Sequence, residues 1–169
     1  VNCCRAGWDV MRAQNYGRIV MTTSSSGLYG NFGQANYGAA KMGLVGFTRV
    51  LAAEGARSNI KANAIAPIAK TRMTEELLGG FGDKILPEEI TPTVCFLAHE
   101  DCPVTGEIYA AGAHRFARIF IATTQGYVHP GDEPTVEDVA EHWARINDQA
   151  GYSVPSDLMD WSRGFLDHR

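Results

Sequence analysis

The chain has 169 residues, which is enough for one domain with a hydrophobic core and too few to expect two full domains. Its 45% hydrophobic and 20% charged residues are typical of a soluble globular protein, and no apolar run approaches the ~20 residues that span a bilayer. The formal charge of -4 argues against a nucleic-acid-binding surface, which needs clustered lysine and arginine. We therefore expect neither nucleic acid nor a membrane as a partner.

The four cysteines (Cys3, Cys4, Cys95 and Cys102) form no C-x-x-C pair and have no histidine-rich surroundings. Their spacing favours reduced, buried thiols in a cytoplasmic protein over disulfides, and it predicts no metal site. The N-terminus has neither an initiator methionine nor a signal or transit pattern, and its first residues resemble the middle of a helix.

The first two thirds of the chain alternate between helix and strand patterns. Residues 1–17 carry apolar side chains at helical spacing and end in a glycine. Residues 18–24, "RIVMTTS", form a short apolar run of the kind that is buried on both faces of a parallel sheet. A helix rich in glycine and alanine is expected at residues 34–57, followed by a strand at residues 60–67, "IKANAIAP". This order predicts a βαβ unit.

Further along, residues 71–80 predict a short helix, residues 86–100 a second one with a proline near its start, and residues 106–113 a third strand. We therefore expect an α/β fold with about three parallel strands and flanking helices.

The pattern weakens after residue 112. Residues 115–130 favour an extended segment, and residues 135–148 predict an amphipathic helix with Thr135 as its N-cap and acidic residues in its first turn. A terminal helix completes a C-terminal extension, which we place at residues 113–169.

The stretch "SSSGLYGNFGQANYGAAK", residues 24–41, carries the chemistry. On one helix, Tyr37 and Lys41 lie on the same face about one turn apart, roughly 6 Å along the axis. A phenol has a reference pKa of about 10, and a cation within ~4–6 Å favours its ionised form, as acid-base chemistry near neutral pH requires. Ser24 follows a buried strand, at the sheet edge where α/β proteins bind ligands. On their own, a tyrosine and a lysine at this spacing are more often solvated residues on a helix surface.

Together these residues resemble the short-chain dehydrogenase/reductase family, whose catalytic serine, tyrosine and lysine match Ser24, Tyr37 and Lys41. The resemblance covers roughly residues 1–112 and implies a Rossmann-like, doubly wound parallel sheet. It implies that Tyr37 exchanges a proton with the substrate oxygen, that Ser24 orients this oxygen, and that Lys41 binds the nicotinamide ribose of NAD or NADP and assists Tyr37.

The resemblance also assigns the strand end to the cofactor. The family's Pro-Gly motif with a following threonine appears here as Pro67, Ile68 and Thr71, which implies contacts with the nicotinamide end. Ile68 departs from the family's glycine, and an isoleucine restricts that turn.

Within the family, "GLYGNFGQANYGAAK" and "NAIAPIAKTRMT" are most similar to the (3R)-hydroxyacyl-CoA dehydrogenase unit of peroxisomal multifunctional β-oxidation enzymes and their bacterial relatives. This implies a 3-hydroxyacyl-CoA substrate and a role in fatty acid metabolism. We take residues 27–33 as a substrate-side loop, in which Tyr29 and Phe32 either line an acyl pocket or anchor the loop. The family commonly dimerises through the small-residue helix, so the resemblance implies a homodimer if the fold is complete.

The sequence leaves alternatives to this function. A 3-oxoacyl carrier-protein reductase or a hydroxysteroid dehydrogenase would use the same scaffold. The glycine-rich first βα turn that binds pyrophosphate, and the family's catalytic asparagine, are not found in the sequence. We therefore expect residues 1–112 to be the C-terminal half of the catalytic domain, which leaves an inactive remnant with a binding role as an alternative. The choice between NAD and NADP is not determined.

Overall fold

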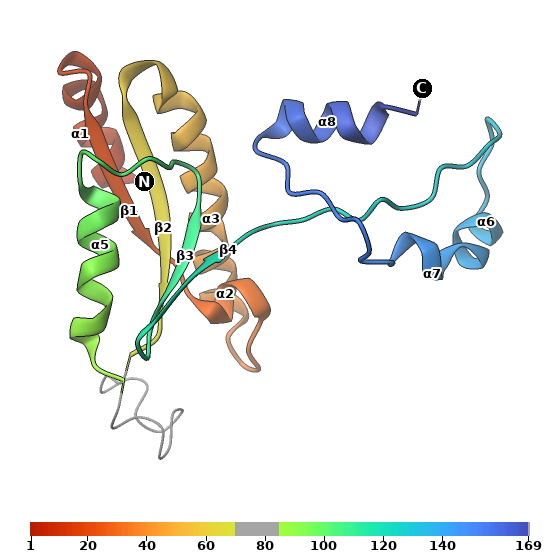
Figure 1. The fold of residues 1–169 in the computed structure, drawn as a ribbon, viewed down its shortest axis with the longest axis horizontal. Coiled ribbons are helices and arrows are strands. Elements are labelled where there is room, and N and C mark those ends of the chain that lie inside the picture. The colour runs from red at the N-terminus through yellow and green to blue at the C-terminus, as the bar shows by residue number, and fades with distance from the viewer. Residues whose placement is uncertain (70–84, 169) are drawn as a thin grey trace. The chain divides into compact units, whose positions relative to one another are not determined.

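A four-stranded sheet with helices on both faces organises the first part of the chain (Figure 1). The structure, a computed structural model, describes residues 1–69 and 85–168. The elements of the first compact unit, Val1–Ile119, are α1 (Asn2–Ala13), β1 (Gly17–Thr22), α2 (Ser25–Tyr29), α3 (Ala35–Gly55), η1 (Ala56–Ser58), β2 (Ile60–Pro67), η3 (Pro87–Ile90), α5 (Thr91–Ala98), β3 (Ile108–Gly112) and β4 (Arg115–Ile119). Helix α3 lies on one side of the sheet and α5 on the other (Figure 1).

The strand order is β1-β2-β3-β4, with parallel pairing among the first three strands and antiparallel pairing of β4 with β3. The three predicted parallel strands are confirmed. Strand β4 lies in the stretch predicted to be extended, and it follows β3 through a turn at Ala113 and His114, whose φ angles are 51° and 57°. Left-handed residues at both positions match the twist of a two-residue hairpin.

The first unit therefore includes β4 and ends at Ile119. The predicted functional boundary, with a catalytic domain at residues 1–112 and an extension at residues 113–169, stays a prediction. The helix predicted at residues 71–80 lies outside the described residues.

The hydrophobic core lies between the sheet and α3. Val45 of α3 packs against Ala64 of β2 and Ile108 of β3, and Met21, Leu28 and Ile119 surround this group. The sheet register aligns Met21, Ala64, Ile108 and Ile119 in one row, so each strand contributes one residue to the surface that α3 covers.

A buried polar cluster fixes the segment that precedes β3. Asn63 is fully buried; its side chain donates to the carbonyl of Val104 over 3.0 Å and accepts from the N–H of Glu107 over 3.1 Å. The neighbouring N–H of Ala62 donates to Thr105 Oγ1 over 3.0 Å. These bonds satisfy groups that would otherwise be buried without partners, and they hold β3 in register beside β2.

Replacing Asn63 with alanine should lower the free energy of unfolding by about 2–4 kcal/mol, because the Val104 carbonyl and the Glu107 N–H would lose buried partners. Chemical denaturation measures this loss. Asn31→Ala is the matched control, since among the described residues the exposed Asn31 amide donates to the Gln34 side chain alone, and its removal should cost less than about 1 kcal/mol. Equal losses in the two variants would contradict the anchoring role.

A charged cluster crosses the β3–β4 pair. The Tyr109 hydroxyl donates to one carboxylate oxygen of Glu107, and Arg118 contacts the other over 3.0 Å. Two effects raise the pKa of Tyr109 to about 12: burial, which is the larger, and the hydrogen bond to Glu107. The phenol therefore stays protonated through the alkaline range in which an exposed tyrosine ionises.

Because the folded protein holds the Tyr109 proton more tightly than the unfolded chain, whose tyrosines titrate near pH 10, the protein should lose stability as the pH rises from about 10 towards 12. Subtracting the ultraviolet titration of Tyr109→Phe from that of the wild type isolates this residue. Glu107→Gln should move its midpoint downward. A wild-type midpoint near pH 10 would contradict the assignment.

The second unit, Phe120–Arg169, contains α6 (Val136–Glu141), α7 (Trp143–Ile146) and α8 (Leu158–Leu166). An antiparallel bridge joins Thr123 to Ser153, with both backbone hydrogen bonds at 2.9 Å. The rings of Phe120 and Tyr152 stack beside this bridge, with centroids 5.9 Å apart.

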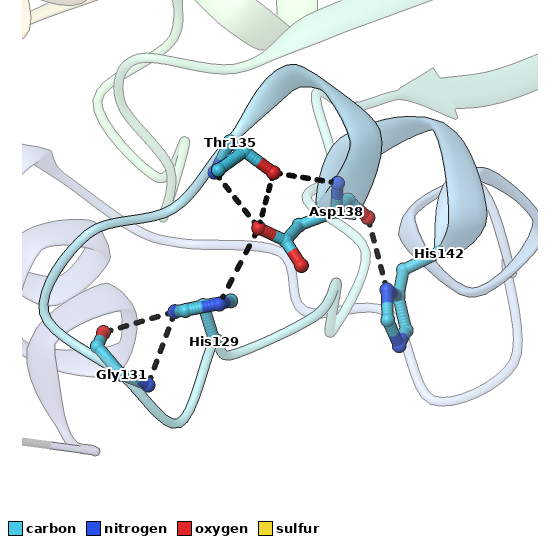
Figure 2. Close-up of polar contacts among 5 residues, drawn as sticks. All are labelled: His129, Gly131, Thr135, Asp138 and His142. Carbon is cyan, nitrogen blue, oxygen red and sulfur yellow. Dashed lines mark hydrogen bonds and ion pairs between the residues drawn. The ribbon is translucent and has the colours of Figure 1, made fainter.

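The predicted N-cap at Thr135 is confirmed, and it forms a capping box with Asp138 (Figure 2). Bonds from the Thr135 hydroxyl and N–H lower the pKa of the Asp138 carboxyl, and His129 lies 3.5 Å from it. The helix predicted at residues 135–148 is interrupted at His142, whose ring nitrogen Nδ1 lies 2.9 Å from the Asp138 carbonyl while the ring stacks on Tyr127.

Among the described residues, all buried hydrophobic side chains belong to the first unit. The predicted burial of the four cysteines is wrong for Cys3 and Cys95, which are exposed because they lie on the solvent-facing sides of α1 and α5; Cys102 is buried and Cys4 is half-buried. No helix in the described ranges is long and apolar enough to cross a membrane.

Candidate functional site

Ser24 lies between β1 and the short helix α2, which the sequence did not predict. We expected a loop at residues 27–33, but α2 occupies its first three positions. Ser24 is the N-cap of this helix, with extended backbone angles, and its Oγ accepts from the N–H of Ser26 over 3.2 Å. The cap orients the hydroxyl and leaves its hydrogen available to a substrate oxygen.

Tyr37 and Lys41 lie together on α3, as their spacing predicted. The Lys41 ammonium nitrogen is 5.6 Å from the centroid of the Tyr37 ring, and it donates to the carbonyl of Thr22 over 2.9 Å. Thr22 is the last residue of β1 and stands two positions before Ser24. One lysine side chain therefore connects the tyrosine with the strand end that carries the serine.

The tyrosine side of this pair is open to solvent. Tyr37 is 40% exposed, so an incoming molecule can reach its ring. Its backbone N–H already donates to the side-chain oxygen of Asn36 over 2.9 Å.

Gly27 permits the close approach of α2 to α3. A Cβ atom on this residue would lie 2.8 Å from Lys41 Cβ and 2.9 Å from the N–H nitrogen of Met42, both closer than real side chains allow. Only a glycine lets the helix that begins at Ser24 pack against the part of α3 that carries Lys41. The sequence shows glycines here, but it does not show which one makes the contact.

Gly27→Ala should separate α2 from α3 and displace Lys41, because the clash falls on its Cβ and on the backbone of Met42. We expect a loss of about 1–3 kcal/mol in the free energy of unfolding. Gly43→Ala is the matched control: its Cβ would meet nothing within 4 Å, and alanine favours helix over glycine by about 1 kcal/mol. Denaturation midpoints that move in the same direction in both variants would refute the packing argument.

The end of β2 lies next to the end of β1, since Thr22 is aligned with Ile65. Pro67 is the last residue of β2, and Ile68 continues towards β3 by donating its N–H to the Ala111 carbonyl over 2.8 Å. Gly112 has a φ of 140°, and a Cβ there would lie 2.0 Å from the carbonyl oxygen of Ile68. This glycine therefore allows the Ile68 backbone to pass close to β3.

The structure thus brings Ser24, Tyr37 and Lys41 to one edge of the sheet, with Pro67 and Ile68 at the neighbouring strand end. Thr71 lies outside the described residues. The cofactor role of Pro67, Ile68 and Thr71 stays a prediction.

The two aromatic residues predicted for the substrate are exposed. Tyr29 is 73% exposed, and Phe32 is fully exposed in the turn between α2 and α3. A groove of about 330 Å³ lies between these helices, lined by Gly27, Asn31, Gly38 and Met42 among others, but by neither aromatic ring. Their substrate role also stays a prediction.

In the described ranges, no three histidine, cysteine or acidic side chains are grouped so that they could hold a metal ion.

Comparisons with known proteins agree on one family. The family model described as short chain dehydrogenase matches residues 1–79. A protein of Mycobacterium tuberculosis described as a short-chain type dehydrogenase/reductase is 46% identical over 151 residues, which cover 89% of this chain and 52% of the relative. The peroxisomal hydratase-dehydrogenase-epimerase of Saccharomyces cerevisiae is 46% identical over 147 residues, which cover 85% of this chain and 16% of that enzyme.

A solved structure of a peroxisomal multifunctional enzyme is also similar to this chain. Full-length peroxisomal multifunctional enzyme type 2 from Drosophila melanogaster superposes with a TM-score of 0.87 at 36% identity, over 98% of this chain and 31% of that one. The chain spans about half the length of the mycobacterial relative and a smaller share of the multifunctional ones.

Proposed function

Because this chain is similar to proteins of the short-chain dehydrogenase/reductase family, we propose that it carries the catalytic residues of an oxidoreductase that uses NAD or NADP to interconvert a secondary alcohol and a ketone. The observation that carries this proposal is the position of the Lys41 ammonium nitrogen. It lies 5.6 Å from the centroid of the Tyr37 ring and donates to the carbonyl of Thr22, at the end of the strand that precedes Ser24.

In this proposal, the three side chains divide the work on one substrate oxygen. Tyr37 donates a proton to the oxygen when a ketone is reduced and accepts it when an alcohol is oxidised. Ser24, oriented by its bond from Ser26, donates a hydrogen bond to the same oxygen. Lys41 places a positive charge beside the phenol, where it stabilises the negative charge that develops in the transition state of proton transfer.

The hydrogen-bond donors at the carboxyl ends of β1 and β2 are suited to bind a dinucleotide. An ammonium group has three hydrogens, and within the described part of the chain Lys41 donates one of them to the Thr22 carbonyl, so donors remain for ribose hydroxyls. The carboxyl ends of β1 and β2 lie side by side here, which is where open α/β sheets bind such ligands. When bound, the nicotinamide ring supplies or takes the hydride.

For the substrate, we propose a 3-hydroxyacyl-CoA and its 3-oxoacyl counterpart. The support is the similarity of residues 27–41 and 63–74 to the (3R)-hydroxyacyl-CoA dehydrogenase unit, together with matches to two multifunctional peroxisomal enzymes. Tyr29 and Phe32 are the proposed acyl contacts. A 3-oxoacyl carrier-protein reductase, a hydroxysteroid dehydrogenase and an inactive binding module are the alternatives.

We also propose a homodimer formed through α3. The exposed side of this helix carries small residues: a Cβ at Gly43 or Gly46 would meet nothing within 4 Å, and Val50 nearby is 52% exposed. Such a surface permits the close approach of a second helix. The cytoplasm is the location expected from the cysteine pattern, and the peroxisome is the alternative that the names of the relatives support.

The central test is turnover of 3-oxoacyl-CoA and 3-hydroxyacyl-CoA by the purified protein, followed by nicotinamide absorbance with NAD and NADP. Tyr37→Phe should lower kcat at least a hundredfold, because it removes the acid-base group, and Lys41→Ala should lower it by a similar factor. Tyr152→Phe, the same chemical change in the second unit, should leave kcat unchanged.

A panel with an acyl carrier-protein thioester and a hydroxysteroid separates the enzymatic alternatives by their kcat/KM values. Cofactor binding without turnover of any substrate, unaffected by Lys41→Ala, would favour the inactive binding module.

A further inference from the structure

The residue before Ser24 makes a contact that the proposed chemistry does not use. Thr23 is 1% exposed, and its Oγ1 donates to the main-chain carbonyl of Lys41 over 2.7 Å. Its backbone N–H donates to the carbonyl of Ile65 in β2 over 2.8 Å. This single threonine therefore links the end of β1 to both the next strand and the helix that carries the catalytic pair.

Lys41 is consequently attached to β1 at two points. Its side-chain nitrogen donates to the carbonyl of Thr22 over 2.9 Å, and its main-chain carbonyl accepts from the hydroxyl of Thr23. The two anchors are consecutive residues, and Ser24 is the next one. Two attachments restrict both the position and the rotation of Lys41 relative to the serine, which a single flexible side-chain bond cannot do.

The start of α3 offers little other fixation of this kind. Its N-cap residue, Gln34, makes no side-chain capping bond. The Thr23 hydroxyl thus provides a directional bond between β1 and α3 at the level of the catalytic lysine, whereas the apolar contacts of α3 are not directional.

We propose that Thr23 is a positioning residue for the reaction. Its buried hydroxyl sets the distance between α3 and the end of β1, and so holds Tyr37 and Lys41 at the correct position relative to Ser24. The proposal rests on the proposed function of these three residues. A displacement of about 1 Å among reacting groups can lower a rate on the order of a hundredfold, so a hydroxyl that touches no substrate can still control kcat.

Thr48 provides an internal comparison. It is equally buried, at 0% exposed, and it also donates its hydroxyl to a backbone carbonyl, that of Leu44 over 2.8 Å. That bond lies within one turn of α3 and connects no second element. Loss of either hydroxyl removes one buried hydrogen bond, but only the loss at Thr23 removes a bond between α3 and the end of β1, which leaves Lys41 attached through its side chain alone.

The experiment compares three variants of the purified protein. Thr23→Val keeps the shape of the side chain and removes the hydroxyl, Thr23→Ser restores a hydroxyl, and Thr48→Val is the control for a lost buried bond. Both valine variants should lower the melting temperature by a few degrees, on the order of 2–6 °C. Thr23→Val should lower kcat at least tenfold with KM changed less than about threefold, Thr23→Ser should recover most of kcat, and Thr48→Val should keep it.

A second readout does not depend on turnover. In lysine- and tyrosine-labelled protein, the Lys41 Cε and Tyr37 ring resonances should shift in Thr23→Val and return towards the wild-type positions in Thr23→Ser. Equal kcat losses in the two valine variants, or unshifted Lys41 and Tyr37 resonances in Thr23→Val, would overturn the proposal. If the wild-type protein turns over no substrate, the proposed function fails, and the resonances alone decide whether Thr23 positions Lys41.

Discussion

Helix α3 packs on the sheet where β2 presents small side chains, and this contact determines where the candidate site residues lie. Ala64 is fully buried beneath Val45, and Ala62 and Ala66 share its face of the strand by the alternation of β structure. Near the C-terminal end of the helix, a Cβ on Gly55 would lie 2.6 Å from the carbonyl oxygen of Ile60. The helix therefore approaches the sheet closely, and its first turns reach the end of β1.

The two ends of this packed layer serve different purposes. Asn63 and the residues before β3 form the buried hydrogen bonds that hold the strands in register, which is a structural role. At the other end, the carbonyls of Thr22 and Lys41 accept bonds from Lys41 and Thr23 respectively, and these bonds connect a strand to a helix. The rigid end supports the fold, and the end that carries exposed Tyr37 is free to meet a ligand.

The second unit is stabilised by different interactions from those of the first. Its helices are defined by local bonds, such as the capping box of Thr135 and Asp138 and the stacking of His142 on Tyr127 (Figure 2). Large apolar side chains at Trp143, Leu158 and Phe165 are more than half exposed. Local hydrogen bonds can thus specify helical turns without a hydrophobic core of their own.

Apolar periodicity and a four-residue spacing are local properties, so the sequence predicted the parallel strands, the helix of residues 34–57 and the pairing of Tyr37 with Lys41. It also located Ser24 at the end of a strand and Thr135 at a helix start. It did not determine α2, since a five-residue helix rich in serine and glycine has weak propensity, or the break at His142, which depends on a bond and a stacking contact of that side chain.

Which of the many small and polar residues make the important contacts became clear from the packing of the elements. Thr22, Thr23 and Ser24 look alike in sequence, yet one accepts from Lys41 through its carbonyl, one donates to it from a buried hydroxyl, and one caps α2. Gly27 differs from Gly30 and Gly33 in what a Cβ would strike, and also in its helical backbone, since Gly30 and Gly33 have φ angles of 79° and 76°. These roles depend on the separation between elements distant along the chain, which no local pattern encodes.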